Sequence, residues 1–192
     1  GKFSDVTDGT GLEYTSGWWN SITAGDFDAD GDMDYVVGNF GLNSDFKCSP
    51  EQPLTIYTKD FDGNGTIDPL ISCYREGREH LIHTRDILVD QISAMKGKFK
   101  DYESYAQADF DEVKKAVGLE QAGQMQVFNF ASSYIENLGN GKFTMRHLPN
   151  EVQFSPVFGM LTGDFNQDGH LDVLVSGNQY DIEPFIGQSE AS

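Results

Sequence analysis

Three short acidic loops contain the residues of this sequence whose types and spacing are best suited to chemistry. The first, GDFDADGDMDYVVG from Gly25, places an aspartate at every second position from Asp26 to Asp34. The others are KDFDGNGTIDPLIS from Lys59 and GDFNQDGHLDVLVSG from Gly163. Each loop has Asp or Asn at positions 1, 3, 5 and 9 and Gly at position 6. Because side-chain oxygens at alternate positions of a tight loop can converge on one hard cation, the pattern predicts metal binding.

Calcium is the expected ion, because it takes about six to eight oxygen ligands, whereas magnesium keeps most of its water. Positions 1, 3, 5 and 9 would supply side-chain oxygens, and the glycine at position 6 would permit a sharp turn. Position 7 would supply a backbone carbonyl, so the side chain of Asp32 is expected to face outward. Up to three Ca²⁺ ions are predicted, held by Asp26, Asp28, Asp30, Asp32 and Asp34; by Asp60, Asp62, Asn64, Thr66 and Asp68; and by Asp164, Asn166, Asp168, His170 and Asp172.

Two other interpretations of the loops are an EF-hand and a plain hairpin turn. An EF-hand needs a glutamate at position 12 followed by a helix, but position 12 is Val37, Ile71 and Val175 in the three loops. A plain turn would also use Asp, Asn and Gly. Recurrence in one register favours the metal site, as does the lack of Lys or Arg within the first and third loops to offset carboxylate repulsion.

The segments around each loop are expected to be strands. The runs WWNSITA, PLTIYT and VFGMLT precede the loops, and YVVG, PLIS and VLVSG follow them. NLGNGKFTM, from Asn137, predicts a hairpin. Between the second and third loops, Ile87, Ile92 and Met95 have helical spacing, with Thr84 or Asp86 as a cap. The sequence therefore predicts a mainly β fold with a helical insertion at roughly 80–120, inside the second repeat.

Composition limits the classes of partner. Among 192 residues, 13 are basic and 31 acidic, giving a net charge of −18, so nucleic acid is not an expected partner. No apolar run approaches the ~18 residues of a transmembrane helix. Cys48 and Cys73 are too few for a disulfide framework, and a single bridge and two free thiols are both compatible with the sequence.

A second candidate site is the segment REGREHLIHTRD, from Arg75 to Asp86. It is either a ligand-recognition patch or active site, or a solvated loop with helix-capping residues. His80 and His83 have i, i+3 spacing, but no third metal ligand accompanies them. Trp18 and Trp19, like Tyr102 and Tyr105, could stack on a sugar ring, although packing between strands is the commoner use of such aromatics.

The strand–DxDxDGxxD–strand units, with an N-x-G-x-G-x-F hairpin between them, resemble the FG-GAP or VCBS repeats of integrin-alpha-type β-propellers. The match is closest to bacterial extracytoplasmic proteins, through GLNSDFKCSPEQPLTIYTKDFDGNGTIDPLIS and the segment that begins SSYIENLGNGKF. This resemblance implies propeller blades with one calcium loop each. It also implies an exported location, in the periplasm, on the outer-membrane surface or secreted, and a binding, adhesion or scaffold role without catalysis.

The sequence departs from complete propellers in its number of units. About three are present, whereas closed propellers have roughly four to eight blades. We therefore expect residues 1–192 to form a single partial propeller segment that either lacks blades or associates through its strand edges. Gly1-Lys2-Phe3 repeats Gly141-Lys142-Phe143, so the chain is expected to begin inside a repeat unit.

Two functional hypotheses follow. The first is a calcium-stabilised, non-enzymatic propeller segment that binds a protein or carbohydrate ligand. The alternative is a calcium-dependent carbohydrate-active enzyme whose site lies on the insertion near His83 and Arg85. A deep pocket around those side chains would favour the enzyme, and a shallow face the binding module.

Overall fold

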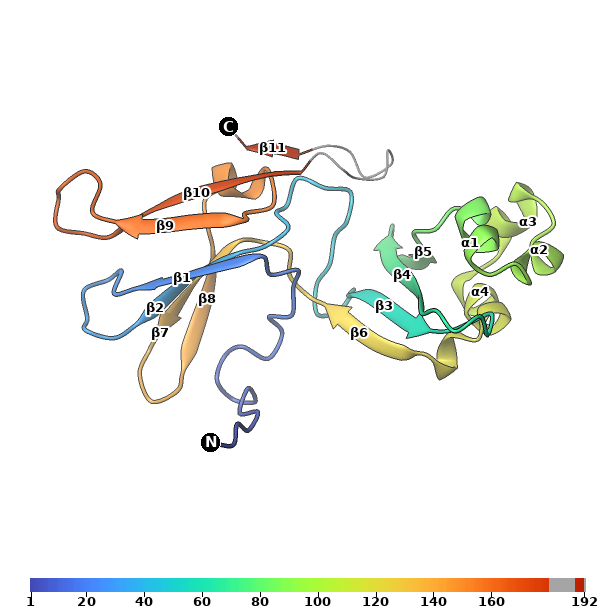
Figure 1. The fold of residues 1–192 in the computed structure, drawn as a ribbon, viewed down its shortest axis with the longest axis horizontal. Helices are drawn as coiled ribbons and strands as arrows, with labels where there is room; N and C mark the ends of the chain where they lie inside the picture. Colours follow the sequence, from blue (N-terminus) through green and yellow to red (C-terminus); the bar gives the residue numbers. More distant parts are fainter. Residues whose placement is uncertain (180–188, 192) are drawn as a thin grey trace. The chain divides into compact units, whose positions relative to one another are not determined.

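The computed structural model describes residues 1–179 and the backbone of residues 189–191. The predicted mainly β structure is confirmed, since the described strands form several antiparallel sheets and no closed barrel (Figure 1). The chain divides into two compact units, one made of residues 1–47 with those from 128 onward and the other of residues 48–127. The three propeller blades and the single segment over residues 1–192 stay predictions.

The first unit contains two antiparallel sheets. One has the strand order β1-β2-β7-β8 and the other has the order β11-β10-β9. The expected hairpin after Asn137 is confirmed as the β7–β8 connection. The strands are β1 (Ser21–Gly25), β2 (Asp34–Gly38), β7 (Ser133–Asn137), β8 (Phe143–His147), β9 (Gly159–Gly163), β10 (Asp172–Gln179) and β11 (Ser189–Ala191), with a 3₁₀ helix η2 at Asn150–Gln153.

The two sheets of the first unit pack against each other through β1 and β9. Thr23 Oγ1 lies 2.7 Å from Thr162 Oγ1, and Ser21 Oγ donates to the Val157 carbonyl at 2.7 Å. The half-buried Trp18 makes edge-to-face contacts with three phenylalanines, Phe40, Phe46 and Phe130, so its ring is used for packing within the unit.

The second unit contains one antiparallel sheet with the order β5-β4-β3-β6, and its helices lie in the chain between β5 and β6. The helices therefore fall in the stretch where the sequence pattern indicates helical structure. The elements are β3 (Leu54–Lys59), β4 (Asp68–Arg75), β5 (Arg78–Leu81), α1 (Arg85–Gln91), α2 (Met95–Lys98), α3 (Tyr102–Gln107), α4 (Phe110–Val117), the 3₁₀ helix η1 (Leu119–Gln121) and β6 (Gly123–Val127).

The helices of the second unit pack one apolar side against the sheet. Tyr57 and Leu70 from the strands join Leu88, Ile92 and Val113 from the helical segment in one buried cluster. The helices start where side chains can cap them: Thr84 Oγ1 accepts the Ile87 N–H, and Asp101 and Asp109 cap α3 and α4 in the same way. α4 ends at Gly118 in a left-handed conformation, φ +84°.

These helices are short. The longest, α4, has eight residues. In the described part of the chain, no helix has the length and apolar character needed to span a membrane. This agrees with the sequence-based expectation for transmembrane helices.

Candidate metal centres

Each acidic loop connects the two strands of a hairpin (Figure 1). The first joins β1 to β2, the second joins β3 to β4, and the third joins β9 to β10. In the first unit, a side-chain methyl of Leu171, from the third loop, lies close against Gly25, at the start of the first loop. The first and third loops therefore lie at the same end of their two sheets.

The loop backbones share an unusual conformation at positions 4 and 6. Position 6 has φ of +96° at Gly31 and +89° at both Gly65 and Gly169. Position 4 is also left-handed, with φ of +62° at Ala29 and +61° at Gln167. No atom would crowd a Cβ at position 6 in any loop, so glycine is needed there for its conformation and not for space.

The same hydrogen bonds close all three loops. The position-1 carboxylate accepts the N–H of positions 5 and 6: in the first loop, Asp30 N–H donates to Asp26 Oδ1 and Gly31 N–H donates to Asp26 Oδ2, both at 3.1 Å. Asp60 and Asp164 accept the corresponding bonds in the other two loops. This arrangement turns the side chains of positions 1, 3 and 5 toward the centre of the loop.

The aspartate at position 9 anchors the loop to the sheet. Asp34 is 0% exposed and Asp68 is 5% exposed. In each loop the N–H of the phenylalanine at position 2 donates to this aspartate, at 3.3, 2.9 and 3.0 Å in chain order. Asp34 also receives the Asn137 N–H at 2.8 Å and the Tyr134 hydroxyl at 2.6 Å, both from β7.

Two of the loops bring three carboxylates close enough to hold one metal ion. Oxygens of Asp26, Asp28 and Asp30 lie within 4.8 Å of one another, and so do oxygens of Asp60, Asp62 and Asp68. The first group leaves out Asp34, whose two oxygens are already hydrogen-bonded to β7 and to the loop. The other predicted ligands of these two loops are the side chain of Asn64 and the backbone carbonyls at position 7, from Asp32 and Thr66.

The third loop has a different ligand composition. Asn166 Nδ2 donates to Asp168 Oδ2 at 2.9 Å, while Asn166 Oδ1 accepts the Asp168 N–H. An amide thus stands where the first loop has the carboxylate of Asp28, and no carboxylate triad is found among the described residues of this loop. It offers Asp164, Asp168 and Asp172 as carboxylates, with the His170 carbonyl at position 7.

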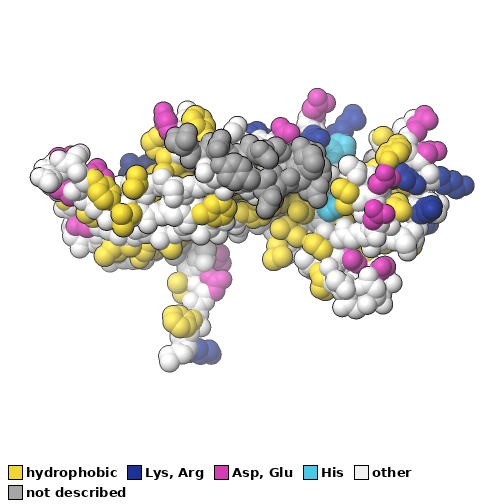
Figure 2. Space-filling model, turned by 45° about the horizontal axis from the view of Figure 1, so that its top comes forward, with side chains coloured by type: hydrophobic (Ala, Val, Ile, Leu, Met, Phe, Trp, Pro, Cys, Tyr) yellow, Lys and Arg dark blue, Asp and Glu magenta, His cyan; other side chains and the backbone are white. Residues whose placement is uncertain are grey.

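The charge of the loops is not neutralised by basic side chains. The ion pairs in the described residues are Arg85–Asp86 and Arg146–Glu136, and neither involves a loop. Lys59, next to the second loop, donates instead to Gln121 Oε1 at 3.3 Å. Figure 2 shows acidic side chains at several separate places on the visible face of the molecule. Local repulsion inside each loop is therefore the feature that a cation would relieve.

Asp32 differs from the sequence-based expectation. Its side chain was expected to face outward, but one of its oxygens, Oδ1, is shielded from solvent and has no hydrogen-bond partner. Burial, and then repulsion from Asp30 and the other loop aspartates, raises the pKa of Asp32. The tight turn at Gly31, φ +96°, and the hydrogen bond from the Asp32 N–H to Asp30 Oδ1 at 3.0 Å hold this residue close to the loop. A shielded carboxylate oxygen without a partner fits a site that takes a cation.

The candidate enzyme residues on the insertion have other contacts. Arg85 donates from Nε to the Phe99 carbonyl at 2.8 Å and from Nη2 to the Lys100 carbonyl at 3.0 Å. These bonds tie the start of α1 to the segment after α2, which is a structural use of the guanidinium. His83 is half-buried with a shielded Nδ1 that has no partner, and burial lowers its pKa.

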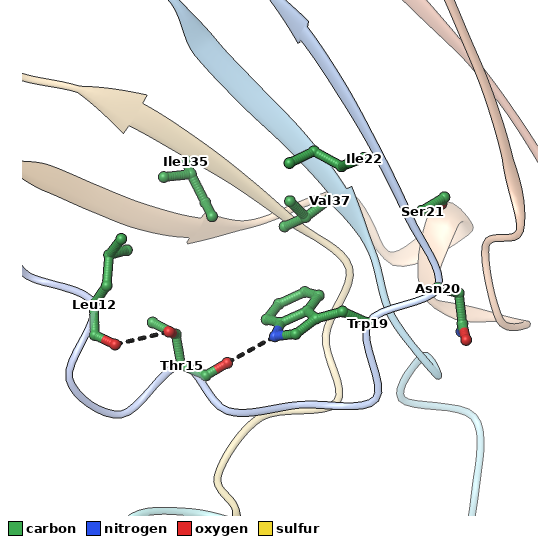
Figure 3. A pocket seen from close by; sticks show the side chains of 8 residues that line it. All are labelled: Leu12, Thr15, Trp19, Asn20, Ser21, Ile22, Val37 and Ile135. Atoms are coloured by element: carbon green, nitrogen blue, oxygen red, sulfur yellow. Dashed lines mark hydrogen bonds between the residues drawn. The ribbon is translucent and has the colours of Figure 1, made fainter. Parts of the chain in front are cut away.

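A separate apolar pocket of about 430 Å³ lies in the first unit (Figure 3). Trp19 forms part of its wall, and the indole Nε1–H donates to the Thr15 carbonyl at 3.0 Å. The Thr15 hydroxyl in turn donates to the Leu12 carbonyl at 2.7 Å, so these polar groups are already satisfied within the chain. Trp19 was a candidate sugar platform by its residue type, but the pocket around it suits an apolar group. It is lined by Leu12, Thr15, Trp19, Asn20, Ser21, Ile22, Val37 and Ile135.

Comparison of the chain with protein-family models, curated proteins and solved structures finds no match.

Proposed function

We propose that this chain is a calcium-binding β-propeller segment of the FG-GAP/VCBS type, with a structural Ca²⁺ ion in each acidic loop. The observation that carries the proposal is the shared loop framework. Three hairpins use the same backbone turn and the same hydrogen bonds to direct oxygen ligands inward, and neither ion pair found among the described residues involves them. Calcium, when bound, would supply the positive charge that holds these oxygens together.

The residues present fit this ion by their chemistry. Calcium prefers carboxylate and carbonyl oxygens, and the first two loops each bring three carboxylates within 4.8 Å. Three bound ions would offset about a third of the net charge of −18. The position-9 aspartates would then connect each loop to its sheet, so that filling the loop also stabilises the hairpin.

The role of the segment in this proposal is binding, adhesion or scaffolding in an extracytoplasmic location. Calcium sites of extracellular modules have dissociation constants of roughly 10⁻⁴–10⁻³ M, which suits ambient calcium outside the cell. Catalysis near His83 and Arg85 is not favoured, since the Arg85 guanidinium is engaged with backbone carbonyls and Asp86.

The structural role of calcium is tested by thermal melting of the metal-free chain in EDTA, in millimolar calcium and in millimolar magnesium. Ligand linkage predicts a higher melting temperature in calcium, because each site at ten times its dissociation constant adds about 1.4 kcal/mol to the free energy of unfolding. Magnesium should give a smaller shift, because the loops offer many protein ligands and magnesium retains water. Identical melts in EDTA and calcium, with metal shown to be absent at the start, would defeat the structural role.

A further inference from the structure

A polar cleft in the second unit lies between the edge strand β5 and the helical segment from Ala106 to Asp111. Its volume of about 470 Å³ falls within the roughly 300–1,000 Å³ of small-molecule sites. None of its residues belongs to an acidic loop. They include Arg78, Glu79 and His80 from β5 and Asp109, Phe110 and Asp111 from the helical segment.

β5 can supply side chains from both of its faces, because it is the edge strand of its sheet. Glu79 pairs across the ladder with Tyr74, and His80 pairs with Cys73, so neighbouring side chains point to opposite faces of the sheet. Both Glu79 and His80 nevertheless line the cleft. The outer edge of a strand also leaves backbone N–H and C=O groups without a ladder partner. The β5 wall therefore offers closely spaced hydrogen-bond donors and acceptors.

Glu79 is held in place on this wall. The Ser72 hydroxyl, which is buried, donates to Glu79 Oε1 at 2.5 Å, and the Tyr74 hydroxyl lies 3.5 Å from Oε2. Burial, and then the nearby Glu79 charge, raises the pKa of the half-buried Tyr74. No ion pair of the described residues involves Glu79. Its carboxylate is thus a fixed acceptor that still has capacity for a ligand hydroxyl.

The cleft also has aromatic surface and further polar groups. Phe110 is half-buried, with its ring 6.5 Å from that of Tyr57, so one side is anchored in the core while part of the ring stays accessible. Arg78, His80 and Gln107 can donate hydrogen bonds, and Asp109 and Asp111 can accept them. Mixed donors and acceptors beside aromatic rings suit a ligand with many hydroxyl groups, each of which both donates and accepts, and with apolar C–H faces.

The cleft continues into two neighbouring hollows. One, of about 240 Å³, shares His80, Ala106, Ala108 and Phe110 with it. Another, of about 310 Å³, is lined by Arg75, His80, Leu81 and Ile82. The exposed side chain of His80 lines all three. Hollows that adjoin at one residue offer room for more than one unit of a ligand, which suits an oligomer better than a single compact molecule.

We propose that this cleft binds a neutral oligosaccharide, with Glu79 and His80 hydrogen-bonding its hydroxyls and Phe110 facing a sugar ring. The proposal gives a ligand to the binding role proposed above, and it does not depend on calcium. The three carboxylates of Glu79, Asp109 and Asp111 outnumber the one guanidinium of Arg78 in the cleft, so repulsion would disfavour acidic sugars. Failure of sugar binding with intact calcium loading therefore counts against this cleft alone.

The test is an NMR titration of the full ¹⁵N-labelled chain in calcium, recording backbone amide signals. The probes are neutral tetrasaccharides of glucose, mannose, galactose and xylose, with tetragalacturonate as the acidic sugar and Nα-acetyl-lysine amide as a simple cation. At least one neutral tetrasaccharide should shift the amides of Arg78–His80 and Ala106–Asp111, and tetragalacturonate should bind at least about tenfold more weakly. The proposal is overturned if no neutral probe shifts the signals of these residues. It is also overturned if tetragalacturonate or the lysine derivative binds more strongly than every neutral tetrasaccharide.

Matched variants separate binding from folding. Glu79→Gln keeps the shape and the Ser72 contact, and His80→Ala truncates an exposed side chain, so both variants should fold. Each should weaken binding of the responding tetrasaccharide about tenfold, through loss of a ligand hydrogen bond. Glu112→Gln, on the same helix as Phe110 but outside the cleft, should bind as the wild type does. Unchanged affinity in both cleft variants also overturns the proposal.

Discussion

Tyr134 donates its hydroxyl hydrogen to Oδ2 of Asp34 at 2.6 Å, which joins β7 to the last residue of the first acidic loop. Asp34 is fully buried, and its other oxygen accepts the Asn137 N–H. Burial, and then the Asp34 charge, raises the pKa of Tyr134, so the hydroxyl stays a donor. The first loop is therefore positioned by a residue about a hundred positions away in the sequence.

Tyr134→Phe removes this hydrogen bond while keeping the ring. Loss of a bond to a buried carboxylate should lower the free energy of unfolding by roughly 1–3 kcal/mol. Urea unfolding in calcium measures the change. Tyr14→Phe, at an exposed tyrosine whose hydroxyl has no such partner, should stay within about 0.5 kcal/mol of the wild type. Equal stabilities of the two variants would show that the Tyr134–Asp34 contact contributes nothing.

Two glycine substitutions should act in opposite directions. Gly31→Ala forces a side chain into φ +96° and should destabilise the chain by roughly 1–2 kcal/mol, although nothing lies within 4 Å of the new Cβ. Gly97→Ala, in α2 and equally uncrowded, should stabilise it by roughly 0.5–1 kcal/mol, because alanine favours helix. Thermal unfolding of both variants checks the signs. A stabilising Gly31→Ala would contradict the left-handed turn.

The half-buried His83 predicts a pH dependence of stability. Its pKa is lowered by burial from the ordinary value of 6.5, so below that pH the unfolded chain takes up a proton that the folded chain resists. The stabilisation is present above about pH 6.5 and should be lost as the pH falls, by at most about 1.4 kcal/mol per pH unit. Urea unfolding at pH 7.5, 6.5 and 5.5 in saturating calcium measures it.

His83→Gln should flatten this pH dependence, whereas His147→Gln, at an exposed histidine, should leave it unchanged. An equal slope in the wild type and in His83→Gln would mean that other groups cause the pH dependence.

Both cysteines are free, which the sequence alone left open. Burial raises the pKa of Cys48 to about 11 and also raises that of the buried Cys73. Native thiols should therefore react with Ellman's reagent at least about tenfold more slowly than thiols of the unfolded chain. The intact mass should correspond to two thiols, and a mass lower by two hydrogens would reveal a bridge instead.

The sequence predicts the local features of this fold well, because their causes are local. Gly31 and its counterparts mark the turns, and Thr84 marks the start of a helix through capping chemistry. Of the three residues chosen by helical spacing, Ile92 and Met95 are buried in the core of the second unit, whereas Ile87 is half-buried and its neighbour Leu88 joins the core instead. Each of these predictions depends on residues within a few positions of one another.

Features that depend on distant residues could not be predicted in the same way. The contact of Asp34 with Tyr134 requires the pairing of β2 with β7, which no local pattern encodes. The structural use of Arg85 likewise depends on where Phe99 and Lys100 fall after the two helices α1 and α2. The shielding of Asp32 Oδ1 from solvent depends on the folded loop. The position of Asp32 directly after Gly31 is the sequence signal that could have suggested this shielding.

The most direct test of the central claim is calorimetric titration of the metal-free chain with calcium. We expect three bound ions, tightest at the first loop, because affinity rises with the number of carboxylate ligands. Asp26→Asn, Asp60→Asn and Asp164→Asn should each remove or strongly weaken one site, while Asp45→Asn, at an exposed aspartate outside the loops, should keep all three. Absence of calcium binding by the wild type, or unchanged stoichiometry and affinity in all three loop variants, would contradict the account.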